Sequence, residues 1–237
     1  MKITLRVVAI AGGLLLVATA AYIRQARAFD SLHAPTVGPC ARPGLQVRLV
    51  GDSWVAGRKL DQSLIDAAAP RAVELQSHGF PGATSRDVYR RLQATPAILS
   101  CADAVVVVVG VNDTGGHRGA DFYAHHVTLI ARLALALHVS PFVVAVPQYD
   151  LAHLPMSMFG RRRLFALLFD GPDPISEYRD ALRQRVEAER LAVTVIAPPP
   201  FSPSHFANPT HLNADGSRAL AVTIARAIVM SEPFSSY

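Results

Sequence analysis

Short apolar runs alternate with longer stretches of mixed apolar and polar residues from about residue 45 onward. Short runs of Val, Ile and Leu are typical of strands buried in a parallel sheet, and the mixed stretches are typical of helices with one apolar face. The expected strands are 45–50, 72–77, 104–109, 142–146 and 192–196, and the expected helices are 60–69, 86–95, 120–138, 175–190 and 214–230. This alternation predicts an α/β protein, a three-layer α/β/α sandwich around a five-stranded parallel sheet.

The amino-terminal segment carries a different pattern. A charge-free apolar run at residues 7–23 lies between Lys2 and Arg6 on one side and Arg24 on the other. The run is long for the core of a signal peptide and short for a membrane span, so both interpretations stay open. We expect residues 1–28 to be a signal peptide or membrane anchor, 29–44 a Pro- and Gly-containing linker, and 45–237 one domain. The protein is then exported, either periplasmic or secreted, or held at the membrane by residues 7–23.

Two cysteines suit an oxidising compartment. Cys40 and Cys101 each precede a predicted strand. If those strands are parallel neighbours, both thiols lie at the amino-terminal edge of the sheet and could form a disulfide. Two separate buried thiols are the alternative.

Charge and histidine spacing exclude some partners. The net charge of +5 comes mostly from dispersed arginines and accompanies no nucleic-acid motif, so we expect no nucleic-acid partner. His78, His125 and His126 lack the spacing of metal ligands, and we expect neither a metal nor a cofactor. Residues 150–174 break the alternation of strands and helices, and a loop of this length could form a lid or a substrate wall.

Four loops carry candidate chemistry. Gly51-Asp52-Ser53 follows the first predicted strand, Gly82-Ala83-Thr84-Ser85 the second, Gly110-Val111-Asn112-Asp113 the third, and Asn208-Pro209-Thr210-His211 precedes the last helix. Ligands bind at the carboxyl edge of such sheets. Each loop also has an ordinary structural interpretation: Ser53 and Ser85, for example, are of a residue type that caps helices.

The four loops together resemble the SGNH, or GDSL-type, hydrolase family, over about residues 46–230. The resemblance implies a flavodoxin-like fold in which Ser53 is the nucleophile and His211 the general base. It also implies that the Ser53 N–H, the Gly82 N–H and the Asn112 side-chain amide stabilise the oxyanion. Trp54, Gln148 and Tyr149 are expected by position to line the cleft.

One residue departs from the family pattern, because Asn208 occupies the position of the family's aspartate. An Asn oxygen can still accept from the imidazole Nδ1–H, but it cannot stabilise the imidazolium by charge. The alternatives are a slow Ser–His dyad, recruitment of another acceptor such as a backbone carbonyl or a carboxylate from 150–174, or loss of catalysis. We expect an exported serine esterase that acts on small-molecule or glycan esters. An O-acyltransferase of cell-surface glycans and a non-catalytic acyl- or carbohydrate-binding protein are the alternatives.

Overall fold

The computed structural model describes residues 43–69, 71–148, 174–208 and 210–231. All of these lie in one compact unit, Val37–Tyr237. The predicted signal peptide or anchor, the linker up to residue 42, Cys40, Tyr149 and residues 150–173 of the predicted lid lie outside the described residues. Within the described ranges, no helix is both long and apolar enough to cross a membrane.

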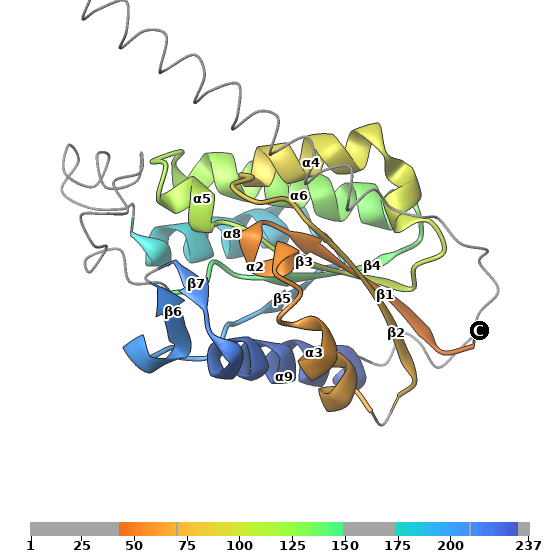
Figure 1. The fold of residues 1–237 in the computed structure, drawn as a ribbon. Coiled ribbons are helices and arrows are strands. Elements are labelled where there is room, and N and C mark those ends of the chain that lie inside the picture. Colours follow the sequence, from red (N-terminus) through yellow and green to blue (C-terminus); the bar gives the residue numbers. More distant parts are fainter. Residues whose placement is uncertain (1–42, 70, 149–173, 209, 232–237) are drawn as a thin grey trace, which may run out of the picture. The chain divides into compact units, whose positions relative to one another are not determined.

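A five-stranded parallel sheet forms the middle layer, as the sequence predicts (Figure 1). Its strands are β1 Leu45–Gly51, β2 Val73–Gly79, β3 Ala104–Val108, β4 Ser140–Val144 and β5 Thr194–Ile196. Their spatial order is β2-β1-β3-β4-β5, and every neighbouring pair is parallel. This is the flavodoxin-like order, in which the chain switches direction across the sheet between β1 and β3.

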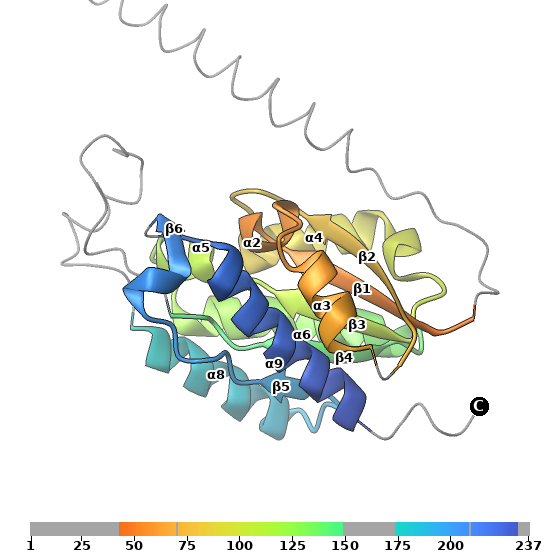
Figure 2. The same cartoon turned by 60° about the horizontal axis from the view of Figure 1, so that its bottom comes forward.

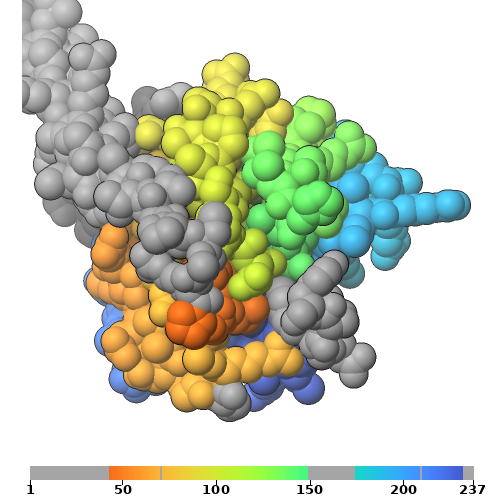
Figure 3. All heavy atoms as spheres, turned by 90° about the vertical axis from the view of Figure 1, so that its right-hand side faces the viewer, coloured from red at the N-terminus to blue at the C-terminus, as the bar shows by residue number. Residues whose placement is uncertain are grey.

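Helices cover both faces of the sheet (Figures 1 and 2). They are α2 Ser53–Ala56, α3 Asp61–Ala67, α4 Ser85–Ala94, α5 Val111–Thr114, α6 Ala120–Ala136, α8 Ile175–Ala188 and α9 Ala214–Met230. On one face α3 packs against α9. On the other, α6 packs between α4 and α8, and the space-filling view shows these helices side by side (Figure 3). The predicted sandwich is therefore confirmed.

The run of valines in β3 explains why the core has two halves. Successive side chains of a strand point to opposite faces of a sheet. Val106 and Val108 join the cluster beneath α3 and α9, whereas Val105 and Val107 join the cluster beneath α4, α6 and α8. All residues of β3 are buried, as expected for a central parallel strand with both faces covered.

The sequence pattern did not predict the shorter elements. These are the helices α2 and α5, the 3-10 helices η1 Pro96–Leu99 and η3 Pro203–His205, and an antiparallel hairpin of β6 Phe206–Asn208 with β7 His211–Leu212. Elements of two to four residues are too short to show a periodicity. The hairpin matters most, because it carries two of the predicted site residues.

The expected capping role of Ser85 is wrong. Thr84 is the N-cap of α4 and forms a capping box with Asp87, whose carboxylate accepts from Thr84 N at 3.0 Å. Ser85 is the first residue inside the helix, and its Oγ donates instead to Asp113 at 2.7 Å. Both Thr and Ser are good caps, so the sequence alone did not distinguish them.

Candidate active site

The site begins where β1 ends. Gly51 lies so close to β3 that a Cβ there would approach Val108 O to 2.0 Å, so only glycine fits. Asp52 then forms the N-cap of α2, and its Oδ1 accepts from Trp54 N at 3.0 Å. The interpretation of Ser53 as a helix cap is therefore wrong. Because Asp52 serves as the cap, the Ser53 hydroxyl is left for another partner.

The β6–β7 hairpin brings that partner. Asn208 lies opposite His211 in the register of the hairpin, and the two strands join through residues 209 and 210. The hairpin is fixed to α2, because Trp54 Nε1 donates to Thr210 O at 2.8 Å. Trp54 also packs edge-to-face against Phe201 and Phe206, with ring centroids 6.0 and 6.5 Å away. The side chain that follows Ser53 thus positions the hairpin.

Ser53, His211 and Asn208 form a continuous chain of hydrogen bonds. The Ser53 Oγ lies 3.1 Å from His211 Nε2, and His211 Nδ1 lies 3.0 Å from Asn208 Oδ1. These distances are within hydrogen-bond reach of a nucleophile and its base, with a third group orienting the base. Among the described residues, the Asn208 oxygen therefore lies where an acceptor for His211 Nδ1 is expected. The alternative of an acceptor from residues 150–173 concerns residues outside the described ranges and stays open.

Thr210 joins Ser53, His211 and Asn208 in one hydrogen-bonded cluster, although the sequence analysis did not single it out. Its backbone N–H and its hydroxyl lie 3.1 and 3.2 Å from Asn208 Oδ1, and the hydroxyl also lies 3.1 Å from His211 Nδ1. The side chain is buried, with only 4% exposed. The signal was present, since a Thr stands between the two residues in the motif, but only the turn of the hairpin aims its hydroxyl at them.

The two backbone N–H groups of the predicted oxyanion hole have no acceptor among the described residues. Neither Ser53 N–H nor Gly82 N–H makes a hydrogen bond within the described ranges. Gly82 has φ of +74° and open space where a Cβ would stand. The glycine is therefore needed for its backbone conformation, which L-residues other than Asn and Asp rarely adopt. Both N–H groups are available for the predicted oxyanion role, which stays a prediction.

The side-chain amide of Asn112, the third predicted oxyanion donor, makes hydrogen bonds within the protein. Its Nδ2 donates to Ala83 O at 2.8 Å and to Asp52 Oδ2 at 3.3 Å, so both of its hydrogens have acceptors within the protein. Asn112 thus ties together the loops that follow β1, β2 and β3. Donation to an oxyanion would require the longer contact, with Asp52, to be exchanged for the ligand.

Asp113 reinforces this connection from the buried side. Its carboxyl accepts from Ser85 N at 2.9 Å and from Ser85 Oγ at 2.7 Å. Burial raises the pKa of Asp113 to about 6, although the hydrogen bonds from Ser85 act in the opposite direction. This residue holds the loop after β3 to the start of α4 and does not line the site's cavity.

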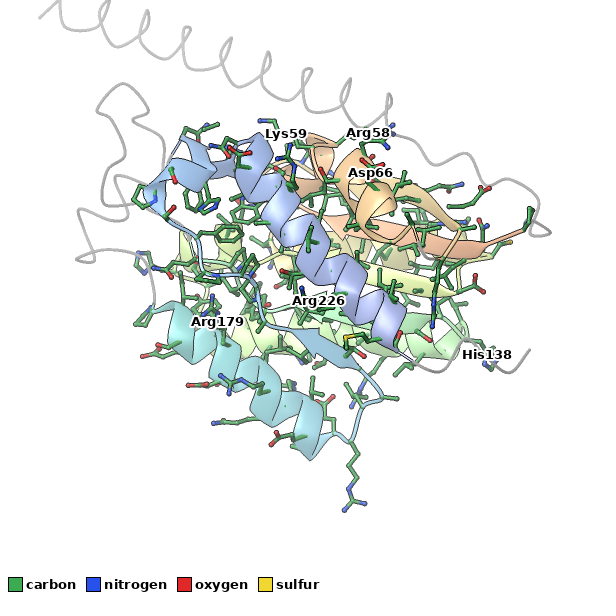
Figure 4. The ribbon with its side chains drawn as sticks, turned by 90° about the horizontal axis from the view of Figure 1, so that it is seen from below. Arg58, Lys59, Asp66, His138, Arg179 and Arg226 are labelled. Atoms are coloured by element: carbon green, nitrogen blue, oxygen red, sulfur yellow. The ribbon has the colours of Figure 1, made fainter. Side chains whose placement is uncertain are left out.

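A small cavity of about 230 Å³ opens beside the Ser53–His211 pair. It is lined by Ser53, Trp54, Gly57, Lys59, Ala207, Asn208, His211, Leu212 and Ser217. Trp54 lines it as expected. Gln148 is exposed and is not among the lining residues, and Tyr149 lies outside the described residues. Lys59 lies near the amino end of α9 (Figure 4), where its Nζ is 3.4 Å from Leu212 O.

Metal binding has no support in the described part of the chain, where no group of three His, Cys, Asp or Glu side chains could hold an ion. Cys101 lies just before β3, and β1 and β3 are parallel neighbours. The geometric premise of the predicted disulfide is therefore met, but Cys40 lies outside the described residues, and the disulfide stays a prediction.

Comparison with known proteins identifies the family. The model of the GDSL-like lipase/acylhydrolase family matches residues 49–219. The chain belongs to this family. No curated protein sequence gives a significant match to this GDSL-like protein.

Several solved structures share the fold of this GDSL-like protein. A carbohydrate acetylesterase from Sinorhizobium meliloti matches with a TM-score of 0.60 and 15% identity, over 78% of this chain and 98% of the other. The M. smegmatis aryl esterase gives 0.59 and 16%, over 78% and 98%. A lipase/acylhydrolase from Enterococcus faecalis gives 0.57 and 20%, over 78% and 95%. At these identities the likeness shows the fold alone.

Proposed function

We propose that the protein is a serine esterase that hydrolyses carboxylic esters through an acyl-serine intermediate. The observation that carries this proposal is the hydrogen-bonded chain from Ser53 Oγ through His211 to Asn208 Oδ1, with contacts of 3.1 and 3.0 Å. Membership of a family of lipases and acylhydrolases supports it.

In the first half-reaction Ser53 Oγ attacks the ester carbonyl, and His211 Nε2 takes the hydroxyl proton as general base. The tetrahedral intermediate places its negative oxygen near the Ser53 and Gly82 N–H groups. His211 then passes the proton to the departing alcohol, which leaves an acyl group on Ser53. In the second half-reaction His211 activates a water that attacks the acyl-enzyme, and the proton returns to Ser53 as the acid leaves.

The proposed substrate carries a short acyl group. The cavity of about 230 Å³ beside Ser53 lies below the usual range for ligand pockets, roughly 300 to 1,000 Å³. We propose that the alcohol is a carbohydrate of the cell envelope or the surroundings. The apolar run at residues 7–23, which is typical of exported proteins, supports this location, and the fold shared with a carbohydrate acetylesterase is compatible with it.

Covalent labelling tests the nucleophile. A fluorophosphonate should attach to Ser53 with loss of fluoride, and peptide mass mapping should find the adduct on this serine. Ser53→Ala should abolish both labelling and hydrolysis of p-nitrophenyl acetate. Its melting temperature should stay close to that of the wild type, because Asp52 and not Ser53 caps α2. Folded wild-type protein that neither labels nor hydrolyses the ester would contradict the proposal and favour a binding protein.

A substrate series tests the acyl length. Among p-nitrophenyl esters, kcat/KM should be highest for acetate and fall as the acyl chain lengthens. Transfer of acetyl to added sugar at the expense of water would instead identify an acyltransferase.

A further inference from the structure

The hydroxyl of Thr210 occupies an unusual place within the cluster. Its Oγ1 lies 3.2 Å from Asn208 Oδ1 and 3.1 Å from His211 Nδ1, while the Thr210 backbone N–H lies 3.1 Å from the same Asn208 oxygen. One residue therefore contacts both partners of the Asn208–His211 hydrogen bond. With only 4% of Thr210 exposed, bulk water cannot readily replace these contacts.

The Thr210 backbone determines how the Asn208 amide is turned. An amide side chain can present either its oxygen or its NH₂ group, and the two arrangements have nearly the same shape. A backbone N–H can only donate, so the atom that faces it must be the oxygen. The Thr210 hydroxyl faces that oxygen as well, and because an amide oxygen has no hydrogen, the hydroxyl is the donor.

This arrangement determines the tautomer of His211. Its Nδ1 faces Asn208 Oδ1 and also the oxygen of a hydroxyl whose hydrogen is already directed to Asn208. Both neighbours present lone pairs, so Nδ1 carries the proton. Nε2 is then unprotonated and directs its lone pair at the Ser53 hydroxyl, 3.1 Å away, as a general base requires.

We propose that Thr210 is a positioning residue that, together with Asn208, replaces the usual carboxylate. Its two donors hold the amide oxygen toward His211 and so keep the imidazole in the tautomer that can accept the Ser53 proton. The catalytic part of this proposal rests on the proposed function of Ser53 and His211. The part that concerns the tautomer does not.

A carboxylate at position 208 would not need this help. Both of its oxygens are acceptors, so no rotation of the group can present a donor to His211. The requirement for Thr210 should therefore depend on which residue stands at 208, and this dependence separates an orienting role from a general contribution to stability.

A double-mutant cycle on p-nitrophenyl acetate hydrolysis tests that dependence. Thr210→Val removes the hydroxyl and keeps the shape, and it should lower kcat about tenfold, the effect of one lost hydrogen bond. KM should stay within about twofold, since Thr210 does not line the cavity beside Ser53. Thr210→Ser should restore most of the loss. In the Asn208→Asp background, Thr210→Val should change kcat by less than about threefold.

Thr128→Val is the matched control. Thr128 is also a buried threonine, with 2% exposed, but its hydroxyl donates to His125 O within α6. Its loss should leave kcat unchanged. Equal losses for Thr210→Val in the wild-type and Asn208→Asp backgrounds, or no loss in the wild-type background, would overturn the positioning role.

Nitrogen-15 NMR of the histidine ring tests the tautomer without any need for activity. His211 is assigned by the signal that disappears in His211→Gln. Wild-type His211 should be in the Nδ1–H form near neutral pH, and Thr210→Val should shift it toward a mixture. An Nε2–H form in the wild type would contradict the proposal even if Thr210→Val failed to fold. An inactive wild type with the Nδ1–H form would contradict the esterase proposal alone.

Discussion

At the scale of single residues, Asn208 gives His211 one neutral acceptor where a carboxylate would supply a full negative charge. Its oxygen lies 3.0 Å from His211 Nδ1, so the orienting part of the role is retained. The electrostatic part is not, because an amide dipole stabilises an imidazolium less than a carboxylate does. For the proposed esterase we therefore expect a low turnover, while the position of His211 is preserved.

Asn208→Asp should separate these two contributions. In a serine protease, the reverse change lowers kcat about 10⁴-fold, largely because the histidine adopts the wrong tautomer. Here the tautomer is already correct, so restoring the charge should raise kcat/KM for p-nitrophenyl acetate by a smaller factor, about 10- to 100-fold. An unchanged or lower rate would show that the charge at 208 does not act on His211.

At the scale of elements, the β6–β7 hairpin is as important as the long helices. It has only two short strands, and a hairpin of this size is not stable alone. Its position depends on the bond from Trp54 Nε1 to Thr210 O at 2.8 Å and on the edge-to-face contacts of Trp54 with Phe201 and Phe206. The neighbour of Ser53 thus determines where His211 is held.

Trp54→Phe should weaken this attachment. The variant keeps an aromatic ring but leaves the Thr210 carbonyl without its donor, which should cost about 1 to 3 kcal/mol of unfolding free energy in urea. Because the hairpin carries His211, kcat should fall more than the loss of stability alone explains. Ile130→Val, in the buried face of α6, is the control: it should cost about 0.5 to 1.5 kcal/mol and leave kcat unchanged. Equal kinetics in both variants would mean that the hairpin holds its place without Trp54.

At the scale of the whole molecule, two buried ionisable groups give folding opposite dependences on pH. Burial, with the positive charges of Arg48 and Arg58, lowers the pKa of His78 to about 4. The unfolded chain therefore binds a proton near pH 6.5 that the folded protein does not bind, so His78 makes stability fall as the solution is acidified. Burial raises the pKa of Asp113 to about 6, so its folded carboxyl keeps a proton that the unfolded chain has lost. Asp113 therefore makes stability fall as pH rises from about 4 to 6.

Replacing either His78 or Asp113 should leave the pH dependence of stability that the other residue causes. The free energy of unfolding of His78→Gln, measured in urea, should decrease relative to the wild type as pH rises from about 4 to 6.5, the interval between the folded and unfolded pKa values. The free energy of unfolding of Asp113→Asn should increase relative to the wild type as pH rises from about 4 to 6. The wild type itself should show a flatter profile than either variant. Parallel profiles for all three proteins would show that neither group is perturbed by burial.

The sequence by itself determined the architecture and the candidate catalytic groups. Runs such as Ala104–Val108, entirely apolar, are typical of strands with both faces covered, and their alternation with helical stretches indicated a parallel sheet with helices on either side. The loops with Ser53, Gly82 and Asn112 follow strands, and the carboxyl ends of parallel strands meet at one edge. The strand pattern and the position of each loop after its strand can be read from neighbouring residues, without knowing which distant residues are in contact.

Only the tertiary structure decided how the groups are used. Three contacts depend on where the folded chain places the side chains. Asp52 caps α2, the Asn112 amide donates to Ala83 and Asp52, and the Thr210 hydroxyl contacts Asn208. Hydrogen bonds are directional and require atoms within about 3 Å. Neither the direction nor the distance can be read from the order of residues in the sequence. Residue types and their spacing therefore left the acceptor of the His211 proton open among several groups, and among the described residues the hairpin places Asn208 Oδ1 3.0 Å from His211 Nδ1.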